Sequence, residues 1–278
     1  MPLSSESRSV VGYLVPGAVA GVVAYAFSRV MIEPLIGAAV DYEGAREHAE
    51  AGGDHDHGHE LFTRTVQANV GAAVGVIAFG IAMGVLFAVA YTVIRVVLER
   101  RGFRPDATGL ALLLAAGMFV AIVLAPGLKY PANPPTVGLP DTIGARSSAF
   151  LTMTVVSVVA AGLALAVGLA WSRRWGRWRA TAVAVGGYVV VILTAMLLMP
   201  SFHEVPGPIS GPERLVLDGF PAEVLGEFRV YSLANQALMW LVIGATWAAL
   251  TALGTRRSTP TQRSVLLGSG RFGHGRTS

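Results

Sequence analysis

Long runs of apolar residues, separated by short polar segments, set the pattern of this chain. A helix that crosses the roughly 30 Å apolar core of a bilayer needs about 20 such residues. Six stretches satisfy this requirement: residues 10–32, 69–94, 109–125, 149–171, 181–199 and 232–253. The pattern therefore predicts an all-α fold, a polytopic membrane helix bundle with about six transmembrane helices.

The first and third stretches need separate comment. The first runs too long for a signal peptide and lacks a small-residue cleavage site after a short core, so we interpret it as a retained helix. The third is the shortest, and we expect it to end where Pro126 follows it. Residues 1–253 are then one transmembrane domain. The basic segment 254–278 is rich in Arg, Ser, Thr and Gly, and we expect it to be a disordered tail.

The charges between the stretches alternate in sign along the chain. Of 21 Lys and Arg residues, 14 lie before the first stretch, after the second and fourth, and in the tail, together with only three of the 17 acids. Loops rich in Lys and Arg stay in the cytoplasm. The sequence thus predicts a multi-pass protein of the plasma membrane with both termini inside and an acidic outer face. This bias also accounts for the net charge of +4, so we predict no nucleic-acid partner.

Composition excludes several kinds of chemistry. The chain has 53% hydrophobic and 14% charged residues and no cysteine, which excludes disulfides, thiolate metal sites and cysteine nucleophiles. Its one lysine, Lys129, follows no glycine, so a Walker-type phosphate loop is absent. We find no nucleophile–base spacing and predict that the protein is not an enzyme.

The outward segment 33–67 carries the clearest candidate chemistry. It holds four of the six histidines, interleaved with acids, and its glycines Gly52, Gly53 and Gly58 favour a flexible loop. Imidazole and carboxylate groups together suit divalent transition metals, and His-rich tracts are a compositional signal for metal binding. The alternative is a solvated acidic loop. The candidate ligands here are His48, His55, His57, His59, Asp54, Asp56 and Glu60.

Two further outward segments add candidates. Segment 126–148 has five prolines and is either a rigid lid or a rigid connector. Near its start, segment 200–231 carries His203 and Glu204, a candidate ligand pair, although a lone histidine is usually structural. Polar residues at the outer ends of the spans would form an outer mouth: Glu33, Asn69, Lys129, Asn133, Asn235 and Gln236.

The centres of the six stretches contain no Asp, Glu, His, Lys or Arg. Such residues usually mark an ion pathway, so a divalent ion would need to cross hydrated, between subunits or with a partner. Pairs of glycines four residues apart within these stretches predict close packing between helices. These pairs are Gly17/Gly21, Gly71/Gly75 and Gly80/Gly84.

Several segments resemble the CbtA family, the probable cobalt transporter subunits. They are Glu33-Pro34 with the DHDHGHE run, RTVQANVGAAVG, KYPANPPTVGLPDTIGARS and FPAEVLGEFRVYSLANQALMW, in this order along the chain. The resemblance implies a protein of five or six helices, cobalt uptake linked to cobalamin biosynthesis, and a small single-helix CbtB-like subunit.

The residues and the resemblance together predict the membrane subunit of a cobalt uptake transporter. Its transported ion is Co²⁺, with Ni²⁺ as the alternative, and it holds no permanent cofactor. A homo-oligomer is an alternative to the small subunit as the second component. The alternative function is a non-transporting membrane scaffold that binds or senses metal.

Overall fold

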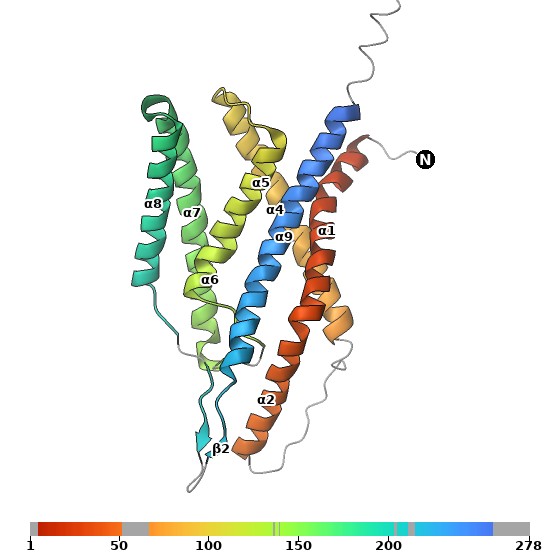
Figure 1. The fold of residues 1–278 in the computed structure, drawn as a ribbon, viewed down its shortest axis with the longest axis vertical. Coiled ribbons are helices and arrows are strands. Elements are labelled where there is room, and N and C mark those ends of the chain that lie inside the picture. The colour runs from red at the N-terminus through yellow and green to blue at the C-terminus, as the bar shows by residue number, and fades with distance from the viewer. Residues whose placement is uncertain are drawn as a thin grey trace, which may run out of the picture.

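The computed structural model describes residues 5–51, 67–135, 137–138, 140–202, 205–210 and 215–257. Long helices dominate these residues, which confirms the all-α prediction. Figure 1 shows the elements α1 (Ser5–Met31), α2 (Glu33–Ala51), η1 (Gln67–Gly71), α4 (Ala72–Arg100), α5 (Ala107–Met118), η2 (Phe119–Leu124), α6 (Ala125–Lys129), η3 (Pro140–Thr142), α7 (Ile143–Trp175), α8 (Arg177–Leu198), β1 (Ile209–Ser210), β2 (Leu215–Leu217) and α9 (Ala222–Arg257).

Six of these helical segments are long and apolar enough to cross a membrane. They coincide with the six predicted stretches but extend beyond most of them. The spans in the structure are Gly12–Met31, Asn69–Arg100, Ala107–Lys129, Ile143–Trp175, Arg177–Leu198 and Ala222–Leu253. Only the first and fifth keep nearly their predicted length, because the polar ends of the other spans continue the helix.

The predicted end of the third span at Pro126 is wrong. The helix widens into the π-helix η2 and continues as α6 to Lys129. Proline lacks the N–H that an α-helix needs, and its ring clashes with the carbonyl of the preceding turn. We attribute the continuation to the wider π turn, which accommodates the proline where a regular α turn would break.

The prediction of a flexible loop over segment 33–67 is wrong for its first half. After a break at Ile32, the chain continues as α2 through Ala51. The break is short because the amides of Leu35 and Ile36 both bond to the carbonyl of Ile32, and Pro34 has no N–H to satisfy. Segment 52–66 lies outside the described residues.

The spans form two packed groups (Figure 1). Helices α1, α4, α5 and α9 pack together around a core of aromatic and small side chains, and α7 and α8 form a separate antiparallel hairpin. Elements η2 and α6 connect the groups through an apolar cluster in which Ala125 and Tyr130 meet Ala149, Met153 and Ile192. We call this cluster the hairpin joint.

Glycines bring α1 and α4 into backbone contact. A Cβ added to Gly80 would lie 2.6 Å from the Cα of Gly21, and one added to Gly84 would lie 2.5 Å from the Cα of Gly17. These two predicted pairs are confirmed, since a methyl group would separate the helices. In the third pair, the prediction is wrong for Gly75, because nothing lies within 4 Å of a Cβ added there.

The two ends of the bundle differ in chemistry. One end carries the α4–α5 and α7–α8 turns with their arginines, and we call it the arginine end. The opposite end carries α2 and the β1–β2 pair, and we call it the strand end. Figure 1 shows that α1 begins and α9 finishes at the arginine end, as six crossings require.

Candidate functional site

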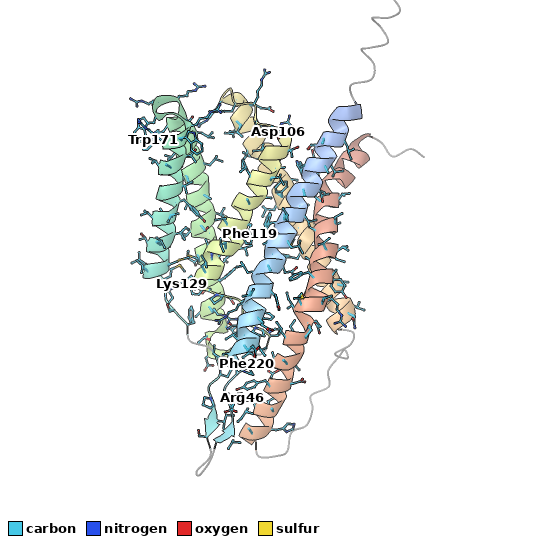
Figure 2. The ribbon with its side chains drawn as sticks, in the orientation of Figure 1. Arg46, Asp106, Phe119, Lys129, Trp171 and Phe220 are labelled. Carbon is cyan, nitrogen blue, oxygen red and sulfur yellow. The ribbon has the colours of Figure 1, made fainter. Side chains whose placement is uncertain are left out.

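Helix α2 is fixed against the strand end of the bundle. The Tyr42 hydroxyl donates to the Asp218 carbonyl at 3.1 Å, and Nη1 of Arg46 donates to the Gly207 carbonyl at 3.1 Å. The ring of Tyr42 also packs edge-on against Phe220, with centroids 5.1 Å apart. Figure 2 shows Arg46 and Phe220 at the strand end, the region where α2 contacts α9. These contacts hold the end of α2 in a defined place.

An apolar cluster supports the same contact from inside. Ala39 of α2 is fully buried and packs with Phe220, Leu225 and Val137. Val137 comes from the proline-rich segment, so this segment, α2 and α9 share one small core. The choice between a rigid lid and a rigid connector for the proline-rich segment stays a prediction, since this contact suits both.

Most predicted metal ligands lie outside the described residues. These are His55, His57, His59, Asp54, Asp56, Glu60, His203 and Glu204. His48 is described, and it is exposed in the last turn of α2. Within the described ranges no group of three or more His, Asp or Glu side chains could hold a metal ion.

Two carboxylates lie on α2 near its middle, one helical turn apart. Burial raises the pKa of Glu43 above its ordinary value of 4.5, and the neighbouring charge of Glu47 raises this pKa further. Both effects penalise the charged carboxylate. A cation near this turn would have the opposite effect and would favour the ionised form.

Asn69 stands at the beginning of the second span and is held by α1. Nε of Arg29 donates to Oδ1 of Asn69 at 3.1 Å, and the Tyr25 hydroxyl donates to the Asn69 carbonyl at 3.1 Å. Glu33 lies four residues after Arg29, in the first turn of α2. The arginine thus fixes the point at which the chain re-enters the bundle after the His-rich tract.

Lys129 and its neighbour link the third span to the end of α8. Nζ of Lys129 donates to Oγ of Ser201 at 2.8 Å, and the Tyr130 hydroxyl donates to the Pro200 carbonyl at 2.7 Å. Burial raises the pKa of Tyr130, so its phenol stays protonated and remains a donor. Lys129 therefore serves as a tie between two spans in this structure.

Asn133 contacts the first turns of α9. Nη2 of Arg229 donates to Oδ1 of Asn133 at 2.9 Å, while the buried Nε of Arg229 has no partner in the described part of the chain. The buried Oδ1 of Asn235, further along α9, likewise has no hydrogen-bond partner there. Gln236, its neighbour, is half-buried.

Hydrogen bonds tie three of the predicted outer-mouth residues to three different places. Asn69 is held by α1, Lys129 by the end of α8, and Asn133 by α9. The amide oxygens of Asn133 and Asn235 are of a type that can coordinate a hard cation, but the charge of Arg229 opposes a divalent ion next to Asn133.

Our sequence reasoning did not select Arg229 as a site residue, although it stands in one of the segments that resemble the CbtA family. The signal that could have found it is its place at the point where the polar start of α9 passes into a long apolar run, where a charge needs a partner.

Comparison with known protein families shows to which family the chain is related. The family described as "Probable cobalt transporter subunit (CbtA)" matches residues 7–252, which is most of the chain. The chain belongs to the CbtA family. No curated protein and no solved structure matches it.

Membership of the CbtA family and six apolar helices together describe a multi-pass membrane protein that is a subunit of a cobalt transporter. The word subunit implies at least one further component. The matched range covers all six spans, together with α2 and the proline-rich segment. The family resemblance predicted from the sequence is therefore confirmed.

Proposed function

We propose that this CbtA protein is the plasma-membrane subunit that takes Co²⁺ into the cell, and that its His-rich tract gathers the ion outside. The observation that carries the proposal is the docking of α2. Tyr42 and Arg46 fix this helix to the strand end, and the tract starts where α2 finishes. The tract is thereby attached to the end of the bundle that holds Asn69, Lys129 and Asn133.

The chemistry of the tract supports capture of a hydrated divalent ion. His48, His55, His57 and His59 offer neutral imidazoles, and the interleaved carboxylates add negative charge. Such a set binds cobalt and also nickel, so we assign selectivity to later steps. The adjacent pair His203 and Glu204 would add ligands from a second segment of the same end.

Orientation follows from charge. The arginine end carries most of the arginines, and Lys- and Arg-rich loops stay in the cytoplasm. Both termini would then lie inside and the strand end outside. Cobalt that enters by this route would be available for cobalamin biosynthesis, the pathway that the family resemblance implies.

The membrane core requires a second component. Within the described residues, the one buried polar or charged side chain is Ser157. A divalent ion has no charged relay there and would cross in a hydrated path completed by a partner. The proposed partner is a small single-helix CbtB-like subunit, with a second copy of this chain as the alternative.

The same observation favours a second candidate function. Among the described residues, no Asp, Glu, His, Lys or Arg is buried as a whole, which suits a scaffold that binds metal outside and passes no ion. This scaffold would sense cobalt or present it to another protein. It differs from the transporter in one measurable respect: cells would bind cobalt at their surface and would not accumulate it.

The deciding experiment is accumulation of radioactive cobalt in cells that lack their own cobalt uptake. The chain is expressed alone and together with the small subunit, with nickel as competitor and surface expression measured in parallel. We expect accumulation that depends on this chain and is strongest with the small subunit. Surface-bound cobalt without accumulation in either arrangement would establish the scaffold instead.

A further inference from the structure

The arginine end contains a polar pocket between two turns that are far apart in the sequence. Nη2 of Arg173, at the end of α7, donates to the carbonyl of Arg101 in the α4–α5 turn at 2.9 Å. A pocket of about 270 Å³ lies beside this bond. Its lining residues are Arg101, Gly102, Phe103, Ser172, Arg173 and Arg177. Figure 2 shows the two turns on either side, marked by Asp106 and Trp171.

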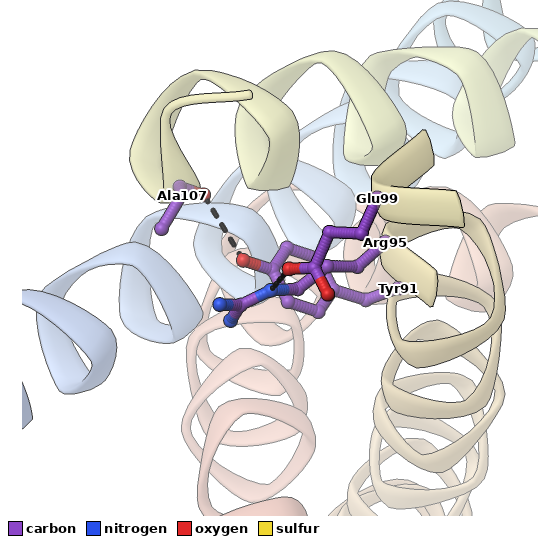
Figure 3. Close-up of polar contacts among 4 residues, drawn as sticks. All are labelled: Tyr91, Arg95, Glu99 and Ala107. Atoms are coloured by element: carbon purple, nitrogen blue, oxygen red, sulfur yellow. Dashed lines mark hydrogen bonds and ion pairs between the residues drawn. The ribbon is translucent and has the colours of Figure 1, made fainter. Parts of the chain in front are cut away.

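The acids near this pocket are already engaged. Oε1 of Glu99 accepts from Nε of Arg95 at 2.9 Å, and Oδ2 of Asp106 accepts from the amide of Gly109 at 2.7 Å. Figure 3 shows the Arg95–Glu99 pair beside Tyr91, whose hydroxyl donates to the Ala107 carbonyl at 3.4 Å. Among the described residues no carboxylate lines the pocket, so its arginines can bind an anion that this part of the chain does not supply.

The geometry of the pocket suits a phosphate group. Arginine guanidinium groups bind phosphate oxygens with two parallel hydrogen bonds. Helix α8 begins at Arg177, and its N-cap residue Gly176 makes no side-chain capping bond. The dipole of this 22-residue helix favours an anion at its first residue, Arg177, which lines the pocket.

Tryptophans place the pocket at the headgroup level of a membrane. The rings of Trp171 and Trp175 have centroids 4.6 Å apart, and Trp178 is 89% exposed. Exposed tryptophans gather where the lipid headgroups begin. A phosphate at this depth belongs to a lipid more readily than to a solute of the bulk water.

An apolar groove runs from the same level along the α7–α8 hairpin. It has a volume of about 470 Å³ and includes Val159, Leu163, Val167 and Trp171 of α7 and Val183 and Gly187 of α8 in its lining. Trp171 ends the groove, and the next residue, Ser172, lines the polar pocket. Only 6% of the apolar stretch of α8 is buried within the chain, so lipid chains can reach this hairpin.

We propose that the pocket at Arg101, Arg173 and Arg177 binds the headgroup phosphate of an anionic phospholipid, with an acyl chain of that lipid in the α7–α8 groove. Basic pockets between transmembrane helices recognise such headgroups. The bound phosphate would bridge the α4–α5 and α7–α8 turns, because arginines of both turns line the pocket. This site lies at the opposite end of the bundle from the His-rich tract and is independent of metal capture.

The test is lipid titration of the purified full chain in neutral detergent, read by native mass spectrometry. The probes are phosphatidylglycerol, cardiolipin, phosphatidylcholine and free inorganic phosphate. One variant combines Arg101→Gln, Arg173→Gln and Arg177→Gln. Its matched control combines Arg104→Gln, Arg174→Gln and Arg179→Gln, which removes the same charge from the same end outside the pocket lining.

We expect tighter binding of the anionic lipids than of phosphatidylcholine. Each arginine near a lipid surface contributes about a fivefold preference, so the pocket variant should weaken anionic-lipid binding on the order of a hundredfold. The control variant should weaken it far less. Equal losses in both variants would show a diffuse basic surface and overturn the site. Binding of free phosphate without a preference for anionic lipids would assign the pocket to a soluble anion. This result would overturn the proposal that the pocket binds a lipid.

Discussion

Arg229 reaches across from α9 to Asn133, and its Nη2 donates to the asparagine Oδ1 at 2.9 Å. This bond joins the proline-rich segment to the helix that forms the middle of the main bundle. The nitrogen Nε of the same guanidinium is buried without a partner in the described part of the chain. The pair is therefore both a tie and a place where a ligand or a water molecule would be accommodated.

We first predict strong coupling between these two residues. Asn133→Ala and Arg229→Gln each remove the bond, and a hydrogen bond to a charged group contributes about 1.5–3 kcal/mol. The double variant should cost much less than the sum of the singles when the free energy of unfolding is measured in detergent. Additive losses would show that the bond contributes nothing. Lys129→Gln, which removes a different tie, is the control and should add independently of Arg229→Gln.

The second prediction concerns the glycine contact between α1 and α4. Gly80→Ala places a methyl group 2.6 Å from the Cα of Gly21, so the helices must separate, at a cost of about 1–3 kcal/mol. Gly75→Ala on the same helix meets nothing within 4 Å and should leave stability unchanged or slightly raised. Thermal unfolding in detergent measures both. Equal effects of the two substitutions would disprove the close contact.

The third prediction is a pH dependence of stability from Glu43. Its pKa in the folded state is raised above 4.5 by burial and by Glu47. Below pH 4.5 the carboxyl is protonated in both states and burial carries no penalty. As the pH rises through 4.5 and then through the raised pKa, the unfolded state loses its proton first, so stability falls.

Glu43→Gln should remove that fall and make the protein more stable than the natural chain at neutral pH. Glu47→Gln removes only the second of the two causes and should have a smaller effect. Unfolding midpoints measured from about pH 4 to pH 8, a range around the ordinary carboxyl values, test both variants. A natural chain that gains stability as the pH rises, relative to Glu43→Gln, would contradict the assignment.

The fourth prediction concerns metal capture by the tract. Replacing His48, His55, His57 and His59 with alanine should raise the cobalt concentration for half-maximal uptake on the order of tenfold, which is about 1.4 kcal/mol. Uptake by the natural chain should weaken in acid, because a protonated imidazole cannot bind a metal ion. His274→Ala, in the tail, is the control. Unchanged uptake in the quadruple variant would remove the capture role.

The spans were predictable because bilayer thickness imposes a length that apolar residues alone can reveal. Helix α2 was not, because its polar residues, its glycines and Pro34 resemble a loop when read without neighbours. Its stability comes from the contacts of Tyr42 and Arg46 with segments more than 160 residues away. No local pattern contains such contacts.

The residues of the candidate site likewise divide into those that the sequence predicts and those that depend on distant contacts. Asn133 was predicted as a mouth residue from its position at the end of a span, but its partner Arg229 was not singled out, because the pairing depends on how the proline-rich segment packs on α9. The glycine pairs were predictable from their spacing, yet the spacing could not distinguish Gly80, which meets a backbone, from Gly75, which does not.

The hairpin joint gives α7 and α8 the geometry of a lever. Its fulcrum is the cluster around Met153, and Trp171 lies 18 residues further along the same helix, about 27 Å at 1.5 Å per residue. A tilt of about 10° at the fulcrum would displace the far tip by about 5 Å, comparable to one turn of helix. The Arg173–Arg101 hydrogen bond then holds the far tip against the α4–α5 turn. Small adjustments beside Tyr130 and Pro200 at one membrane face would thus be magnified at the other.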